Sequence, residues 1–309
     1  GEAWQRRMAR SKPVKALLDA VWPAVEPAPL IASLLSDPDR LASAADGVLT
    51  ADEQAVLRWD RPRSAKAARW TAADRVLIDE ALGLIERTPS YGHIVVDEAQ
   101  DLSPMQCRAV ARRTGHGSVT VLGDLAQGTA PWAARRWQDS LAHFGKPDAA
   151  LTALTTGFRV PDAVVTLANR LLPYLGVDVP EAVSLRHDGA LTVRAGAAVP
   201  DVVREALGHE GSIAVIAADA AVPALTARLL DAGDRVTVLP ASTAKGLEYD
   251  HVIVVEPADI VAADPRGLHR LYVVLTRAVS RLDVLHTSPL PAPLAPFGDL
   301  EASVARNDD

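Results

Sequence analysis

Two strings of polar residues, each directly after a short apolar run, have residue types that suit phosphate chemistry. In the first, the run His93–Val96 leads into Asp97 and Glu98. Ligands of open α/β sheets bind beyond the carboxyl ends of the strands. There one carboxylate can hold Mg²⁺, largely through water, while its neighbour orients and deprotonates an attacking water. The alternative is that both acids only cap the helix that begins at Ser103-Pro104.

The second string follows the run Val119–Leu122 and ends in Gln127. A glutamine one turn beyond a strand end can reach a γ-phosphate and respond to its presence. The Gly123-Asp124 turn inside this string is uninformative by itself.

The elements that must position these strings alternate between strands and helices. Short apolar, β-branched runs recur with helical segments between them, at residues 93–96, 119–122, 191–193, 213–216, 235–239, 252–255 and 282–285. Runs buried on both faces that alternate with helices are typical of a parallel sheet covered on both sides. The sequence therefore predicts an α/β fold, preceded by a helical lead-in over residues 1–90.

Composition excludes several classes of protein. The 309 residues include 32 Lys and Arg against 39 Asp and Glu, a net charge of −7, which argues against a uniformly basic protein that coats nucleic acid but permits a local basic groove. The single cysteine, Cys107, allows neither an intrachain disulfide nor a Cys-x-x-Cys metal site. Because no apolar run approaches the roughly 18 residues of a membrane span, and no secretory signal is recognisable, we expect a cytoplasmic protein.

A domain boundary is expected near Gly145–Asp148, where a helix over 132–144 ends and a strand over 151–155 begins. The first domain, 1–148, then contains two clear strands and is incomplete. The second domain covers 149–287, and 288–309 is expected to form a flexible tail.

The two polar strings resemble motifs II and III of the superfamily 1 helicases, the UvrD/Rep-type motor ATPases. Further motifs follow in the family's order: motif IV at Leu154–Pro161, motif V at Ser242–Asp250 and motif VI at Leu271–Ala278. The resemblance covers residues 93–287. It implies two RecA-like domains of the P-loop NTPase kind, with ATP and Mg²⁺ bound between them.

The resemblance also implies a role for individual residues. The family pattern assigns Mg²⁺ binding to Asp97, water activation to Glu98, γ-phosphate sensing to Gln127, and phosphate contacts to Arg159 and Arg277. It assigns nucleotide binding to Phe158, which would stack on the adenine, to Glu248, which would bind the ribose, and to Lys245 and Gly246 of motif V. Arginine suits the phosphate role because its planar fork stays protonated. The alternative for an arginine on a helix is a solvated surface position.

The sequence departs from the family in three places. The phosphate-binding Walker A loop, Gly-x-x-x-x-Gly-Lys-[Ser/Thr], is not found, since the single Gly-Lys pair, Gly145-Lys146, is followed by Pro147. We therefore expect this chain to be the C-terminal part of a longer motor, or one subunit of a split motor, with its partner supplying that loop. Motif III has alanines where the family has an aromatic residue and an arginine, and motif V has Ser242 where a histidine often contacts nucleic acid.

Trp132 stands where the family has a tryptophan that stacks on a base. A tryptophan at the head of a helix that also contains Trp137 could equally belong to the core, and the sequence leaves both interpretations open.

The residues of motifs II and III are most similar to those of the HelD branch. These are bacterial ATPases that bind RNA polymerase and strip nucleic acid from it. The segment from Arg159 to Ser242 is also too short for the accessory domain of UvrD-type helicases. The resemblance thus implies remodelling of RNA polymerase–nucleic acid complexes. The alternatives are a DNA helicase of the UvrD/Rep type and a protein-binding module that does not hydrolyse ATP.

Overall fold

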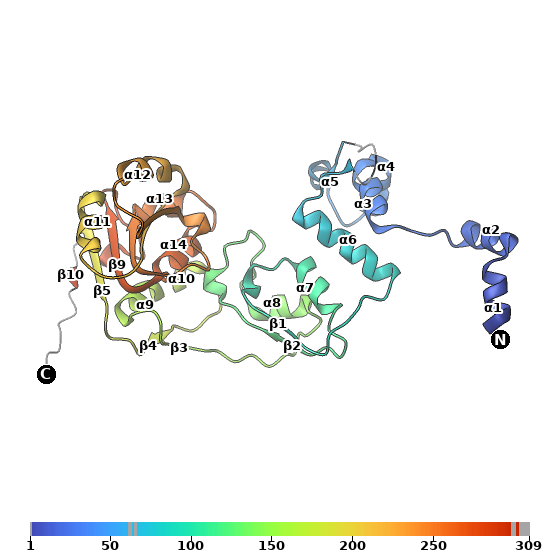
Figure 1. Ribbon diagram of the computed structural model, residues 1–309, viewed down its shortest axis with the longest axis horizontal. Coiled ribbons are helices and arrows are strands. Elements are labelled where there is room, and N and C mark those ends of the chain that lie inside the picture. Colours follow the sequence, from blue (N-terminus) through green and yellow to red (C-terminus); the bar gives the residue numbers. More distant parts are fainter. Residues whose placement is uncertain (1, 61–63, 65–66, 298–300, 303–309) are drawn as a thin grey trace. The chain divides into compact units, whose positions relative to one another are not determined.

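The computed structural model describes residues 2–60, 64, 67–297 and 301–302. The chain forms two compact units. The first comprises Gly1–Ile94 with Met105–Val119, and the second comprises Val95–Pro104 with Thr120–Asp309 (Figure 1). The boundary expected near residue 148 and the flexible tail stay predictions.

The first unit is built from helices, as the sequence predicts for its lead-in. They are α1 (Glu2–Ala9), α2 (Lys12–Val21), α3 (Pro27–Ser36), α4 (Pro38–Ala44), α5 (Ala51–Leu57), α6 (Ala72–Ile85) and α7 (Pro104–Ala111). Thr50 and Thr71 begin α5 and α6 with reciprocal capping boxes, which satisfy free N–H groups of the first turns. Ile31 and Leu35 of α3 pack on Ala81 of α6 to form a small core.

A charged network joins α6 to α7 within the first unit. Asp79 and Glu80 on α6 accept hydrogen bonds from three arginines of α7 and the residues directly after it, Arg108, Arg112 and Arg113. The hydrogen bonds from Arg113 lower the pKa of Asp79, and those from Arg108 lower the pKa of Glu80. Both carboxylates are therefore stabilised in their charged form by the fold.

Strands β1 (Ile94–Val96) and β2 (Val119–Val121) form a two-stranded sheet. The Ile94 amide donates to the Ser118 carbonyl over 3.2 Å, and the Leu122 amide donates to the Val96 carbonyl over 2.8 Å. From the first of these bonds to the second, the residue numbers increase along both strands. The two strands are therefore parallel. Each strand leads into a short 3₁₀-helix, η2 (Ala99–Asp101) after β1 and η3 (Leu125–Gln127) after β2.

The second unit contains a larger sheet that confirms the predicted α/β fold. In the described part of the chain its parallel strands are ordered β7-β6-β8-β9-β5, and β10 (Glu301–Ala302) pairs antiparallel with β5 at the edge. The parallel strands are β5 (Ala190–Ala195), β6 (Ile213–Ala217), β7 (Val236–Pro240), β8 (Tyr249–Val255) and β9 (Ala278–His286). Each lies on an apolar run that the sequence marks as a strand.

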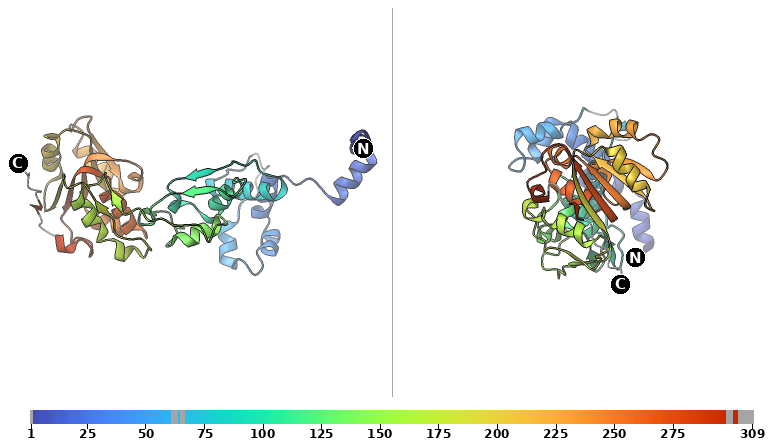
Figure 2. Two further views of the ribbon diagram at one scale, coloured as in Figure 1. Left: turned by 90° about the horizontal axis from the view of Figure 1, so that it is seen from below. Right: turned by 90° about the vertical axis from the view of Figure 1, so that its left-hand side faces the viewer.

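Helices cover both faces of this sheet, as Figure 2 shows for the yellow to red part of the chain. Alternate residues of one strand point to opposite faces. Accordingly, Ile216 and Val254 pack in a core with α9 (Asp162–Asn169), α10 (Leu172–Leu175), α13 (Pro257–Ala262) and α14 (Gly267–Leu275). Val215 and Ile253 pack in a second core with α11 (Val199–Leu207) and α12 (Val222–Arg228).

Two local predictions were wrong. The helix expected over 132–144 is shorter, α8 (Trp137–His143), because residues 129–136 form turns whose Thr129 and Ala130 amides both donate to the Asp101 carboxylate. The strand expected over 151–155 is absent, since Leu151 and Leu154 are exposed and no sheet buries them. A two-residue strand, β3 (Thr156–Gly157), follows instead and pairs with β4 (Val183–Ser184).

The predicted tail is described only in part. Residues 288–297 include the 3₁₀-helix η6 (Ala295–Phe297), β10 follows at 301–302, and residues 298–300 and 303–309 lie outside the described residues. Among the helices that the structure describes, none combines the length and apolar character needed to cross a membrane.

Candidate functional site

Asp97 and Glu98 lie in the loop that leaves β1, and both carboxylates are exposed. Glu98 has a left-handed backbone with φ 53°, a conformation that residues with a Cβ rarely adopt. The Asp97 carboxylate accepts a hydrogen bond from the Glu98 amide over 2.8 Å. Because of this turn, the adjacent side chains of Asp97 and Glu98 point in different directions.

Gln100 connects the loop after β1 to the loop after β2. Its side chain is buried, with its Nε2 donating to Glu98 Oε2 over 2.7 Å and its Oε1 accepting from the Asp124 amide over 3.2 Å. A Cβ atom at Gly123 would lie 2.2 Å from Gln100 Oε1, so only glycine permits this approach. The absence of a side chain at Gly123 in the second string thus lets Gln100 of the first string lie against it.

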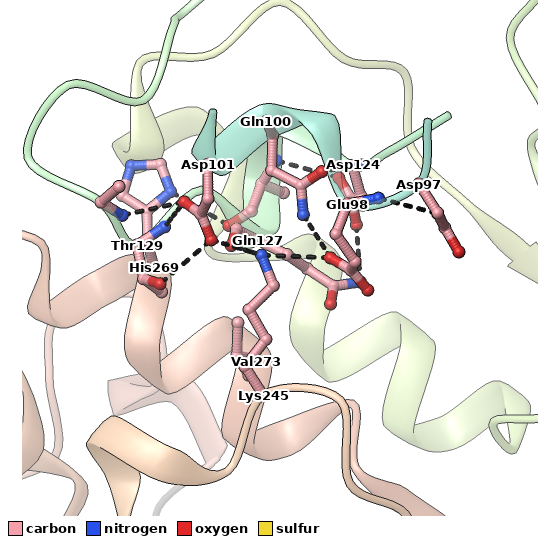
Figure 3. Close-up of polar contacts among 12 residues, drawn as sticks. Asp97, Glu98, Gln100, Asp101, Asp124, Gln127, Thr129, Lys245, His269 and Val273 are labelled. Carbon is pink, nitrogen blue, oxygen red and sulfur yellow. Dashed lines mark hydrogen bonds and ion pairs between the residues drawn. The ribbon is translucent and has the colours of Figure 1, made fainter. Parts of the chain in front are cut away.

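Lys245, in the segment between β7 and β8, reaches both of these loops (Figure 3). Its Nζ lies 2.5 Å from Asp101 Oδ2 and 3.1 Å from Glu98 Oε2, and it donates to the Gln127 carbonyl over 3.2 Å. The ammonium group neutralises part of the negative charge that the acidic loop gathers.

Gln127 and Arg277 are in direct contact. Gln127 Nε2 donates to Asp124 Oδ2 over 3.0 Å, and its Oε1 accepts from Arg277 Nη2 over 2.9 Å. Arg277 also donates to the carbonyls of Val273 and Leu247, so its guanidinium is fixed although it is 4% exposed. Burial is the main reason that the pKa of Arg277 is lowered from its high ordinary value, and repulsion from Arg159 acts in the same direction.

Two further predicted site residues, Arg159 and Glu248, lie close enough to Arg277 for their charges to act on it. Arg159 and Glu248 form an ion pair with each other, and each side chain is about half exposed. Phe158 is 71% exposed, and Gly246 has φ +77° with open space at its Cβ position. The side chains of Phe158, Arg159 and Glu248, and the backbone at Gly246, therefore remain accessible to a ligand.

Trp132 lies in a turn and not in the helix expected for it. Its ring is 52% exposed and its Nε1 donates to the Asp101 carbonyl over 2.8 Å. A half-exposed ring is not a core residue, so the core interpretation was wrong. The base-stacking role stays a prediction.

Several contacts at the site involve residues to which the sequence assigned no role. They are Gln100, Asp101, Asp124, Arg266 and His269. The first three belong to the strings that drew attention to the site, so a closer reading of those strings could have found them. Arg266 and His269 lie three residues apart at the start of α14, and polar residues on an otherwise apolar helix were the available signal.

The donor set suits a phosphate compound with a hard cation. Carboxylate oxygens are ligands that Mg²⁺ accepts, and Mg²⁺ is commonly bound by one or two carboxylates together with substrate phosphates and water. The described residues contain no group of three or more His, Cys, Asp or Glu arranged to hold a metal.

Parallel strands with helices on both faces, and acidic and amide side chains beyond the ends of β1 and β2, define an α/β protein of the RecA-like class. In a comparison with protein families, residues 63–286 match the viral superfamily 1 RNA helicase core domain. This match covers more than two thirds of the 309 residues. The chain therefore belongs to the superfamily 1 helicase core family.

Three of the solved structures to which the chain is similar are described as helicases or as a part of one. The C-terminal domain of a possible DNA helicase from Lactobacillus plantarum WCFS1 is 22% identical, with a TM-score of 0.35, over 46% of this chain and 94% of that domain. An arterivirus nonstructural protein 10 helicase in complex with DNA is 19% identical, with a TM-score of 0.41, over 68% of this chain and 43% of that chain. Another crystal structure of an arterivirus nonstructural protein 10 helicase is 20% identical, with a TM-score of 0.42, over 68% of this chain and 42% of that chain. The chain thus spans less than half of that viral helicase, and curated proteins gave no match.

Proposed function

We propose that this chain forms the hydrolytic and force-transmitting part of an ATP-driven superfamily 1 motor that acts on nucleic acid. The observation that carries the proposal is the 2.9 Å hydrogen bond between Gln127 Oε1 and Arg277 Nη2. It joins a side chain beside the acidic loop to a buried arginine at the end of α14. A change at the γ-phosphate position can therefore be passed directly to the larger sheet.

The proposed roles follow the arrangement of the side chains. Asp97 contributes to Mg²⁺ binding, and Glu98 orients and deprotonates the attacking water. Gln127 contacts the γ-phosphate, while Arg159 and Arg277 stabilise the negative charge that develops on the transferred phosphoryl group. Phe158 stacks on the adenine, Glu248 binds the ribose, and Lys245 with Gly246 shape the segment that presents Glu248.

Two of these roles require rearrangement of contacts that the chain makes by itself. Arg159 and Glu248 are bound to each other, so nucleotide must separate this ion pair to engage both. Lys245 is bound to Glu98 and Asp101, and part of this contact would have to open when Asp97 holds Mg²⁺, which would polarise the phosphate oxygens. Because Arg159 and Glu248 are half exposed, separating them costs little.

We further propose that a Walker A loop from another segment or another chain completes the nucleotide site. The sequence contains no such loop, and backbone N–H groups of that kind normally provide much of the affinity for the phosphates. This missing portion is the first partner that the proposal requires.

Remodelling of RNA polymerase–nucleic acid complexes is the most specific function that we propose. The support is that β4 to β7 and their helices fill residues 162–241 within one α/β unit, leaving no segment for a separate accessory domain there. This agrees with the HelD branch. A DNA helicase of the UvrD/Rep type is the alternative, and in either case Trp132 is proposed to stack on a base.

The hydrolytic role is tested in the complete motor, meaning this chain together with the portion that contains Walker A. We expect Glu98→Gln to lower ATP turnover by about 10²–10⁴-fold, the usual contribution of a general base. Glu210→Gln, at an exposed glutamate of the same unit, is the matched control and should leave turnover unchanged. Turnover that survives Glu98→Gln would overturn the assignment.

The choice between partners needs a second experiment. Capture of purified RNA polymerase without unwinding of a DNA duplex would support the polymerase function. Duplex unwinding without polymerase binding would support the DNA helicase. A motor that binds polymerase but hydrolyses no ATP would instead be a binding module, and the motor proposal would fail.

A further inference from the structure

Three consecutive carbonyl groups in the loop that contains Gln127 each accept a hydrogen bond from a different side chain of the larger α/β part. The Ala126 carbonyl accepts from His269 Nδ1 over 3.0 Å. The Gln127 carbonyl accepts from Lys245 over 3.2 Å, and the Gly128 carbonyl accepts from Arg266 over 3.2 Å. Arg266 also donates to the Ala133 carbonyl. The backbone on both sides of Gln127 is therefore bound to α14 and to the segment before β8.

His269 is the central residue of this arrangement because both of its ring nitrogens are engaged. Nδ1 contacts a carbonyl, which can only accept, so this nitrogen carries the hydrogen. Nε2 lies 3.0 Å from Arg266 Nη1, which can only donate, so this nitrogen must be an acceptor without a hydrogen. The two contacts together favour a neutral imidazole with its hydrogen on Nδ1 over the other tautomer.

The surroundings of the ring favour that neutral form. The side chain is buried, and burial is the main reason that the pKa of His269 is lowered, with the positive charge of Arg266 acting in the same direction. Hydrogen bonding to the carbonyls of Ala126 and Leu175, and the negative charge of Asp101, act in the opposite direction. A protonated ring would lose its bond with Arg266 and place two cations 3.0 Å apart.

We propose that neutral His269 is a positioning residue that fixes the loop around Gln127, holding the Ala126 carbonyl directly and the Gly128 carbonyl through Arg266. The consequence of this positioning for the motor rests on the proposed function, since the position of the loop decides where Gln127 contacts Arg277. The loop contact itself does not depend on any nucleotide. Protonation of His269 releases the loop and so uncouples Gln127 from α14.

Hydrogen exchange of this chain, without nucleotide, tests the proposal. The reporters are amides of the loop at Ala126, Gln127, Gly128, Thr129 and Ala130, which donate within the loop or to Asp101. His269→Leu keeps the volume of the ring but removes both polar contacts, and His269→Asn restores a donor near the Nδ1 position. His143→Asn, at an exposed histidine of α8, is the matched control.

We expect these amides to exchange at least about tenfold faster in His269→Leu than in the wild type, with His269→Asn in between and His143→Asn unchanged. In the wild type, lowering the pH from about 7.5 to about 5.5 should accelerate loop exchange beyond the intrinsic pH effect, and His269→Leu should show no such excess. Unchanged protection in a folded His269→Leu, or identical exchange in the Leu and Asn variants, would overturn the proposal.

Nitrogen chemical shifts of the ring provide an independent readout. At neutral pH, ¹⁵N-labelled His269 should show a protonated Nδ1 and an unprotonated Nε2. The opposite tautomer, or a charged ring, would contradict the arrangement. Neither measurement involves ATP. If the Glu98→Gln experiment contradicts the motor proposal, the positioning role of His269 is not affected. If the His269 experiments contradict that role, the proposed role of Glu98 in hydrolysis is not affected.

Discussion

Arg277 combines a buried position with a full set of hydrogen-bond acceptors. Its guanidinium donates to the carbonyls of Val273 and Leu247, to Gln127 Oε1 and to the Thr276 hydroxyl. A buried cation is tolerated when its donors are satisfied in this way. Besides any contact with a phosphate, Arg277 thus connects the end of α14 to two neighbouring segments.

We expect Arg277→Lys to destabilise the second unit by about 2 kcal/mol, because a single ammonium group cannot reach acceptors on opposite sides and leaves buried oxygens unpaired. Urea unfolding followed by far-ultraviolet circular dichroism measures this loss. Arg136→Lys, at a side chain that is 63% exposed, is the control and should change stability by less than about 0.5 kcal/mol. Equal stability of the Arg277→Lys variant would show that the lysine satisfies the same acceptors.

The sequence indicated Glu98, Gln127 and Arg277 because each lies in a short string with a recognisable local pattern. It did not indicate Arg266 and His269, whose partners lie 138 and 143 residues away along the chain. Contacts of that separation depend on how the sheet folds, and a local string contains no information about them. Gln100, to which the sequence assigned no role, has the same limitation at a shorter separation along the chain, since its partner Asp124 belongs to the other string.

At the scale of elements, strands were predictable where they are buried on both faces. Val252–Val255 is apolar at every position because both faces of β8 pack against helices. The run Leu151–Thr155 is apolar only in part and forms no strand, although the Thr155 carbonyl beside β3 accepts a hydrogen bond from the Val183 amide of β4. The start of α8 was wrong for a different reason, since the Asp101 carboxylate fixes the preceding backbone as a turn.

The α6–α7 network gives a prediction at this scale. Asp79→Asn should lower the stability of the first unit by about 1 kcal/mol at neutral pH, because the partly exposed carboxylate loses its arginine partners. The pKa of Asp79 is lowered in the fold, so its contribution is present above the ordinary carboxylate pKa near 4 and is lost as the pH falls through the folded value.

Unfolding by urea at about pH 7 and about pH 3 measures this dependence. The difference between wild type and Asp79→Asn should shrink at the lower pH. Asp46→Asn, at an exposed position in the same unit, serves as the control and should differ little from the wild type at either pH. A difference of the same size at both pH values would show that the network acts through packing and not through charge.

At the scale of the whole molecule, the chain contains the carboxylates and arginines that we propose act in hydrolysis, but its sequence contains no Walker A loop. We therefore expect this chain by itself to be folded and to bind Mg²⁺-ATP only in the millimolar range or more weakly, about 4 kcal/mol of binding free energy. Isothermal titration calorimetry of the chain measures this affinity. Micromolar binding would show that it contains a phosphate site of another kind.

The strained backbone at Glu98 has a consequence for how this position tolerates change. Glycine adopts φ 53° without the penalty of about 1 kcal/mol that a Cβ brings, and asparagine adopts it more readily than glutamate. A variant library sorted only for thermal resistance should therefore enrich asparagine at position 98, because asparagine relieves the strain and keeps a side-chain acceptor, whereas glycine would leave the buried Gln100 Nε2 without its Glu98 partner. A library of the complete motor sorted for growth that depends on ATP turnover should retain glutamate. The two selections would diverge at this codon, which makes position 98 a place where folding and catalysis compete for one side chain.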